Sequence, residues 1–356
     1  MASIAVTGSS GAVGRRVLNT LVDEPSVDRL VAIARRPQSP PTGNRQADDD
    51  SAPPAEVESL RLDLGIDDPA PAFHGADTVI HLADDHTLRT DPRAATAILD
   101  RVLGAMTAAG CRHLVLSSSA LVYGARSDNP VPITEAQPIA PVRELGYAVA
   151  KARLEERAAR WAAENEAGLA VLRPVAALSE GDSSWIGSAL RAAAVVRAEQ
   201  VDPPVQFLHH DDLAAALTLA GLARLDGPYN VAPDGWIGND EFRALRGEAS
   251  IRIHPRLSRV PLRAAKAVAD RRLLDGLEPY VTWSWVVAND RLRAEGWAPQ
   301  FTNAEAWVAG TPPPLLGLVS GRRRQEIALG AASVVGAAAV GGAWLAVRGS
   351  AARWRR

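Results

Sequence analysis

Several residue types are scarce in this 356-residue chain, and each shortage excludes a class of protein. The one cysteine, Cys111, excludes an internal disulfide framework and is typical of a reducing compartment. The formal net charge is only -2, so the chain lacks the excess of basic residues that binding to nucleic acid would require. The start, MASIAVTGSSG, lacks the basic and long apolar regions of a secretory signal. We therefore expect a cytoplasmic protein that does not bind nucleic acid.

Lysine and tyrosine are also scarce, which gives weight to the place where they occur together. Of the 39 basic residues only Lys151 and Lys266 are lysine, and the other 37 are arginine. There are four tyrosines.

Hydrophobic residues make up 47% of the chain, which at this length is enough for one large or two modest domains with a real core.

The first half of the sequence alternates short apolar runs with longer amphipathic ones. Strands are predicted at 3–7, 30–34, 57–62, 78–83, 113–117 and 169–172, and helices at 14–22, 94–109, 147–166 and 211–223. This alternation predicts an α/β fold with a doubly wound, Rossmann-like parallel sheet. Residues 1–173 would form the first domain, with a mobile surface insertion at 37–55 and with 205–225 packing back on it.

The strongest local signal is TGSSGAVG at residues 7–14, which follows an apolar strand and opens a helix. Glycine lets the backbone come close to a pyrophosphate, and the first N–H groups of the helix would bind it. The motif in this context predicts a dinucleotide-binding domain. The contacting residues would be Gly8, Ser10, Gly11, Val13 and Gly14.

The end of the second predicted strand indicates which dinucleotide is bound. An acidic residue there would bind the ribose 2′-hydroxyl of NAD, whereas a nearby arginine accommodates the 2′-phosphate of NADP. The sequence has Ala34 at this place, followed by Arg35 and Arg36. We therefore predict NADP, with Arg35 as a cofactor-binding residue. NAD stays open as the alternative, because arginine is abundant in this chain.

A second group of residues suits proton transfer. Tyr147 and Lys151 are four residues apart on a predicted helix and so lie on one face. The ammonium of Lys151 would favour the phenolate and lower the pKa of Tyr147, and arginine cannot replace this compact donor. The serine triplet at 117–119 ends a strand, and one of its hydroxyls would hold the substrate oxygen.

Together these motifs resemble the extended short-chain dehydrogenases/reductases of the NAD-dependent epimerase/dehydratase family. The matching segments, in order, are TGSSGAVG, LDL (62–64), HLA (81–83), LSSSALVYG (116–124), YAVAK (147–151), LRPV (172–175), HHDDLAAAL (209–217), PYNVAPDG (228–235) and NDRLRAEGW (289–297). They cover about residues 3–310. The set is specific for the superfamily but says little about the substrate.

The resemblance implies a role for each matching residue. Tyr147 would be the catalytic acid and base, Ser119 would orient the reacting carbonyl or hydroxyl, and Lys151 would also bind the nicotinamide ribose. The cofactor-binding residues would further include Asp63, Leu64, Leu82 and Ala83. Asp63 would meet the adenine, although an aspartate at that place can also cap a helix.

Three positions depart from the family pattern. Ala95 replaces a frequent asparagine that supports the proton relay, Asp84 replaces a frequent alanine, and Ala148 replaces a frequent glycine. These departures leave room for slow or absent catalysis. The alternative function is therefore a membrane-tethered NADP(H)-binding scaffold or redox sensor.

The second half is less regular, and residues 174–204 and 226–312 are expected to form a small substrate lobe. The run His209-His210-Asp211-Asp212 is interpreted as a strand-to-helix junction with an acidic N-cap. We predict no metal site there, because adjacent ligands point apart and no second His/Cys cluster exists.

The C-terminal end has a different composition. A basic linker at 313–326 precedes residues 327–347, which contain no charge and no proline, and a basic tail follows at 348–356. A helix of 21 residues spans roughly 30 Å, the thickness of the hydrocarbon layer of a bilayer. We predict a transmembrane helix, with a docked terminal helix or an Ala/Gly tail as alternatives.

The sequence thus predicts an NAD(P)-dependent enzyme that transfers hydride at a secondary alcohol or ketone. The family resemblance favours a nucleotide sugar as the small-molecule substrate, and a membrane helix would favour a lipid-like hydroxy compound. The resemblance also implies a homodimer formed through the two long helices that flank the sheet.

Overall fold

A computed structural model of the chain describes residues 1–36, 41, 55–83, 92–180, 182–183, 203–246 and 271–311. Residues 1–311 form one compact unit, and 312–356 form a second unit that lies outside the described residues. Most of the insertion predicted at 37–55 lies outside them as well. Within the described residues, no helix has both the length and the apolar composition needed to cross a bilayer. The membrane helix at 327–347 stays a prediction, because it belongs to the second unit.

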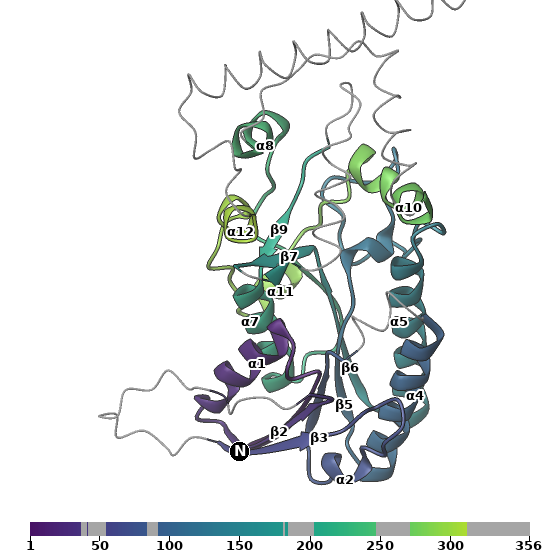
Figure 1. The fold of residues 1–356 in the computed structure, drawn as a ribbon, viewed down its shortest axis with the longest axis vertical. Helices are drawn as coiled ribbons and strands as arrows, with labels where there is room; N and C mark the ends of the chain where they lie inside the picture. The colour runs from purple at the N-terminus through teal and green to yellow at the C-terminus, as the bar shows by residue number, and fades with distance from the viewer. Residues whose placement is uncertain are drawn as a thin grey trace, which may run out of the picture. The chain divides into compact units, whose positions relative to one another are not determined.

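Seven parallel strands form the central sheet (Figure 1). In chain order they are β1 (Ala2–Thr7), β2 (Val27–Ala34), β3 (Glu56–Arg61), β4 (Thr78–His81), β5 (His113–Ser117), β6 (Gly168–Pro174) and β10 (Gly227–Val231). Their spatial order is β10-β6-β5-β4-β1-β2-β3, so the direction of winding reverses between β1 and β4. Ligands of such sheets bind beyond the carboxyl ends of the strands at this switch point. The predicted doubly wound sheet is confirmed.

Burial explains why these runs form strands. In the inner strands β1 and β2, residues 4–6 and 30–33 are fully buried, as expected for a sheet that is covered on both faces. The edge strand β3 is exposed at most positions. Strand β4 ends at His81, two residues earlier than predicted, and the backbone of Leu82 and Ala83 then turns toward the glycine loop.

Helices cover both faces of the sheet (Figure 1). On one face α1 (Ala12–Val22) packs against α7 (His210–Leu222), and on the other α4 (Pro92–Ala109) packs against α5 (Gly146–Asn165). The short helix α2 (Ala70–Phe73) lies against α4. The buried side of α1 consists of Gly14, Val17, Leu18, Leu21 and Val22, which have helical spacing.

A second, smaller sheet has three strands, with β7 (Ala176–Ser179) between β8 (Asp182–Ser183) and β9 (Phe207–His209). Helix α12 (Asn303–Ala309) packs on β7 and β9. The remaining described helices are η1 (Ala120–Tyr123), α8 (Asn239–Arg246), α10 (Arg271–Thr282) and α11 (Asp290–Ala294). Strand β10 lies at the edge of the large sheet, although sequence analysis assigned residues 226–312 to the substrate lobe.

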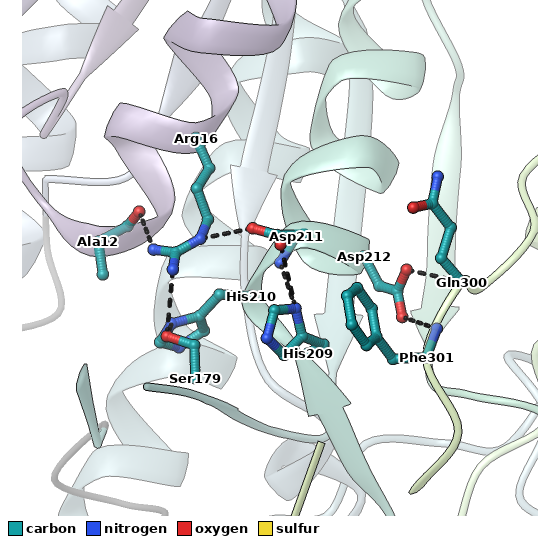
Figure 2. A network of polar contacts seen from close by, with 9 residues as sticks. All are labelled: Ala12, Arg16, Ser179, His209, His210, Asp211, Asp212, Gln300 and Phe301. Carbon is teal, nitrogen blue, oxygen red and sulfur yellow. Dashed lines mark hydrogen bonds and ion pairs between the residues drawn. The ribbon is translucent and has the colours of Figure 1, made fainter. Parts of the chain in front are cut away.

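The junction between β9 and α7 joins the two sheets (Figure 2). The predicted acidic N-cap is wrong: the cap of α7 is His209, whose Nδ1 accepts from the N–H of Asp211 at 3.3 Å. Asp211 instead forms an ion pair of 2.6 Å with Arg16 of α1. The carboxylate of Asp212 turns the other way, because it accepts hydrogen bonds from the N–H groups of Gln300 and Phe301.

The two neighbouring aspartates provide a matched test of this junction. Asp212→Ala leaves two N–H groups of the C-terminal segment without their acceptor, and we expect it to lower the free energy of unfolding by about 2–3 kcal/mol. Asp211→Ala removes a partly exposed ion pair and should cost less than about 1 kcal/mol. Urea denaturation of both variants measures the difference. Equal losses would show that Asp212 does not hold the segment.

Candidate active site

The glycine loop between β1 and α1 is packed against the end of β4. Gly8 has a φ of +72°, and a Cβ there would lie 2.7 Å from the carbonyl carbon and oxygen of Leu82. A Cβ on Gly14 would lie 2.4 Å from the carbonyl oxygen of Gly8. Both distances are far below contact distance, so only glycine fits at these two places. Two backbone segments therefore meet at the switch point without a side chain between them.

The first turn of α1 is open to an anion. Its N-cap is Gly11, and no side chain caps the helix there. The guanidinium of Arg15 donates to the carbonyl of Ser10 at 2.9 Å and brings a positive charge to the loop. Uncapped N–H groups, the positive end of the helix and a nearby cation suit a pyrophosphate. The residues present thus fit a nicotinamide dinucleotide, and Ser10 and Val13 are partly exposed in this segment.

The adenosine side of the predicted cofactor site lies at the ends of β2 and β3. Arg35 and Arg36 are exposed directly after β2. Arg61, also exposed, pairs in register with Ala34, so it places a third arginine beside them. Sequence analysis did not single out Arg61, although its position at the end of the third strand was a usable signal.

The structure shows how Asp63 is held. Its Oδ1 accepts from the N–H of Gly65 at 2.9 Å, so Asp63 stabilises the turn after β3. Residues 64–67 form a turn and not a helix, so the alternative interpretation of Asp63 as a helix cap is wrong, and its contact with adenine stays a prediction. Leu64 is buried beside it. Leu82 and Ala83 are half-buried at the end of β4, next to the glycine loop.

The predicted catalytic residues come from two elements that pack against each other. Ser119 follows β5 and starts η1, where its Oγ accepts from the N–H of Leu121 at 3.3 Å. Tyr147 and Lys151 lie in the first turns of α5, which packs on η1. The exposed fractions of Ser119, Tyr147 and Lys151 are 7%, 8% and 2%. The Nζ of Lys151 lies 5.8 Å from the centre of the Tyr147 ring.

The three consecutive serines have different contacts. The carbonyl of Ser117 accepts from Nζ of Lys151 at 2.7 Å. The hydroxyl of Ser118 donates to Glu155, and the hydroxyl of Ser119 begins η1. The first two serines therefore connect the end of β5 to α5, and the third is the one predicted to hold substrate.

A buried ion pair behind these residues was missed from the sequence. Arg173 of β6 contacts Glu155 of α5 at 2.6 Å, and both residues are buried. Arg173 also donates to the hydroxyl of Tyr123, which donates to Asn230 of β10; both distances are 2.8 Å. The available signals were the glutamate four residues after Lys151 and the arginine in LRPV.

Charge and burial act in opposite directions on this pair. Burial alone would lower the pKa of Arg173, but the hydrogen bond and the charge of Glu155 outweigh it and raise that pKa above its usual value. Burial raises the pKa of the Tyr123 hydroxyl, although Arg173 opposes the effect. At neutral pH the network therefore contains a charged arginine and a neutral tyrosine.

Two of the three departures from the family pattern can be located. Ala95 is fully buried on α4, and its methyl group cannot form a hydrogen bond. Ala148 is buried on α5. Asp84 lies outside the described residues.

Two helical glycines allow a controlled test of the cofactor site. In Gly14→Ala the new Cβ would displace the loop, so we expect NADPH binding to weaken by about tenfold or more, which corresponds to about 1.4 kcal/mol. The control is Gly104→Ala on α4, where a Cβ meets nothing within 4 Å. It should leave binding unchanged and raise the melting temperature slightly. Titration of NADPH fluorescence measures the NADPH affinity of the two variants, and equal affinities would contradict the assigned site.

Comparison with known proteins agrees with this architecture. The profile of the family described as NAD dependent epimerase/dehydratase matches residues 4–232. A search of curated protein sequences gave no match.

Solved structures share the fold at low sequence identity. The crystal structure of gox2253 is 21% identical with a TM-score of 0.62, and the alignment covers 87% of this chain and 97% of that one. The UDP-glucose 4-epimerase of Thermus thermophilus, in complex with NAD, is 19% identical with a TM-score of 0.59, covering 86% and 97%. The UDP-N-acetylglucosamine 4-epimerase of Bacillus cereus is 16% identical with a TM-score of 0.57, covering 86% and 96%. With more than half of its length matched by the family profile, the chain belongs to the NAD-dependent epimerase/dehydratase family of enzymes.

Proposed function

We propose that this enzyme uses NADP to oxidise a secondary alcohol of a nucleotide sugar and NADPH to reduce the corresponding ketone, with Ser119, Tyr147 and Lys151 as its catalytic residues. The observation that carries the proposal is the buried ammonium of Lys151, held by the carbonyl of Ser117 and one helical turn from Tyr147. An uncapped helix and a glycine loop at the sheet's switch point supply a place for the dinucleotide.

The roles of the three side chains follow from their chemistry. Lys151 stabilises the phenolate form of Tyr147, so the phenol oxygen accepts the proton of the substrate hydroxyl and returns it when the carbonyl is reduced. The hydroxyl of Ser119 holds the substrate oxygen during the transfer. A bound nicotinamide supplies the hydride acceptor and donor. Because these side chains are nearly buried, bulk water has little access to the reacting atoms.

The choice of a nucleotide sugar rests on the structural relatives. Several of them are epimerases of UDP-glucose, UDP-galactose or UDP-N-acetylglucosamine, and two of the relatives were solved with UDP-glucose. A lipid-like hydroxy compound is the alternative substrate, and it gains weight only if residues 327–347 anchor the enzyme in a membrane.

The preference for NADP rests on the arginines at the ends of β2 and β3. Arg35 follows Ala34, where an enzyme specific for NAD would present an acidic residue. Arg61 lies beside Ala34 and adds positive charge at the same edge. NAD is the alternative, since the Thermus thermophilus relative was solved with NAD.

The homodimer through α4 and α5 stays a prediction. Among the described residues, none of the large apolar side chains that are exposed belongs to either helix. A dimer on this face would therefore depend on polar and small residues.

Substitution of Tyr147 tests the catalytic assignment. We expect Tyr147→Phe to lower turnover by at least about a hundredfold, because the proton acceptor is lost, while NADPH affinity stays within about twofold. Product formation from UDP-glucose, UDP-N-acetylglucosamine and a panel of apolar secondary alcohols is followed by NMR. Tyr229→Phe, on β10, is the matched control and should retain activity.

The same experiment decides between enzyme and scaffold. Tight NADPH binding without turnover of any panel member, and without any effect of Tyr147→Phe, would contradict the proposal and favour a cofactor-binding scaffold. Turnover of apolar alcohols alone would overturn the nucleotide-sugar assignment.

Substitution of Arg35 tests the cofactor preference. Loss of a charged hydrogen bond to the 2′-phosphate should weaken NADPH binding by about tenfold or more and leave NADH binding nearly unchanged. Fluorescence titration of Arg35→Ala with both cofactors measures the ratio of affinities. Arg101→Ala, on the exposed side of α4, controls for net charge. An equal loss for both cofactors would rule out a role in discrimination.

A further inference from the structure

The buried pair Glu155–Arg173 is connected to both elements that carry the catalytic residues. Glu155 lies one helical turn beyond Lys151 on α5, and it accepts the hydroxyl of Ser118, the residue before Ser119. Arg173 binds both carboxylate oxygens of Glu155, with its Nε at 3.2 Å from each. On its other side Arg173 reaches Tyr123, the last residue of the η1 turn that Ser119 begins.

These contacts form a closed path that connects the elements bearing the site residues. The path runs from β5 through Ser118 to α5, through Glu155 to β6, and through Arg173 and Tyr123 back to η1. Asn230 of β10 holds the hydroxyl of Tyr123, because its side chain accepts from that hydroxyl and donates to the carbonyl of Ile133. The segment bearing Ser119 and the helix bearing Tyr147 are thus held against each other by directional bonds.

The charges of the pair matter as much as its geometry. A buried carboxylate one turn from Lys151 would weaken the effect of that ammonium on Tyr147 if nothing balanced it. Arg173 balances it at 2.6 Å. Further titratable groups that contact this network are the neutral phenol of Tyr123 and, among the described residues, the carboxylate of Glu135, which accepts from the N–H of Asn230.

We propose that Glu155 and Arg173 are positioning residues of the reaction: Glu155 holds the serine-bearing segment against α5, and Arg173 cancels its charge so that Lys151 acts on Tyr147 unopposed. The second part of this proposal rests on the catalytic pair proposed above. The first part rests on the contacts of Ser118 alone.

The titration of Tyr147 gives a readout that needs no substrate. The chain has four tyrosines, and burial raises the pKa of Tyr123, Tyr229 and Tyr280. The phenolate that forms at the lowest pH is therefore assigned to Tyr147. Ultraviolet absorbance of phenolate is recorded against pH for the full chain, and each titration is repeated in a Tyr147→Phe background. The difference between the two curves is the transition of Tyr147.

The two single variants should move this transition in opposite directions. Glu155→Gln leaves the charge of Arg173 without its partner, which favours the phenolate, so the midpoint should fall. Arg173→Met leaves the carboxylate without its partner, so the midpoint should rise. Glu155 is eight residues from Tyr147, about 12 Å along the helix, so each shift should be roughly one pH unit.

Two further variants separate charge from structure. The double variant Glu155→Gln/Arg173→Met restores local neutrality, and its midpoint should return to within about 0.3 pH units of the wild type. It also avoids a buried unpaired charge, so we expect it to fold even if Arg173→Met does not. Glu156→Gln, which alters the exposed pair with Arg160 on the same helix, is the control and should cause no shift.

The outcomes distinguish this inference from the proposed function. If Lys151→Met leaves the Tyr147 midpoint unchanged, the catalytic pair itself is wrong. If Lys151→Met raises the midpoint but Glu155→Gln and Arg173→Met do not shift it, or shift it in the same direction, the charge-balancing role fails while the catalytic pair stands. If Arg173→Met does not fold, the other two variants decide. A Tyr147 midpoint that falls in Glu155→Gln and returns in the double variant supports the charge-balancing role, and a midpoint that stays low in the double variant refutes that role.

Ser118→Ala tests the first part of the proposal, in which Glu155 holds the serine-bearing segment against α5. This variant should lower turnover while the Tyr147 midpoint stays unchanged, and full activity would refute the first part.

Discussion

A buried ammonium is the constraint on which the site depends. Lys151 is 2% exposed, so its charge has lost most of its water and must be stabilised by the protein. The carbonyl of Ser117 provides one bond at 2.7 Å, and the ring of Tyr147 lies within 5.8 Å. Because the end of β5 supplies that carbonyl, the position of the lysine is tied to the sheet and not only to its own helix. The edge of the sheet thereby fixes the position of Lys151, the residue proposed to lower the pKa of Tyr147.

The parallel sheet explains why the two halves of the site meet. All seven strands run the same way, so the glycine loop after β1, the backbone after β4 and the serines after β5 come to one edge. At the switch point the chain leaves β1 and β4 toward opposite faces, and this divergence opens space for a ligand. The absence of a Cβ at Gly8 lets the end of β4 close against the loop. The proposed dinucleotide site and the proposed proton-transferring residues would then lie at the same edge of the sheet.

Local patterns predicted the parts of the structure that depend on neighbours in the sequence. Strand β5 was predicted with its observed bounds, and α4 and α5 to within two residues, because apolar periodicity and burial agree there. The helix cap at His209 was missed, since aspartate is the commoner cap and the sequence does not show that Asp212 is needed by Gln300 and Phe301. Strand β10 was assigned to the lobe because its pairing with β6 joins segments far apart in the chain.

The same reasoning explains why Glu155 and Arg173 escaped sequence analysis. In a chain with 37 arginines, one more arginine carries no signal by its type, and only the fold shows that this one is buried. Its chemistry is nevertheless specific: a planar guanidinium can bond to both oxygens of a carboxylate and still reach a third group, and it stays charged when buried. Lysine at 173 could not bind Glu155 and Tyr123 in this way, and arginine at 151 would be too bulky to act as a compact charge beside the phenol. The different roles proposed for the two cations therefore follow from their shapes: Arg173 connects Glu155 to Tyr123, and Lys151, one of the two lysines of the chain, lies where the proposed reaction would need a point charge.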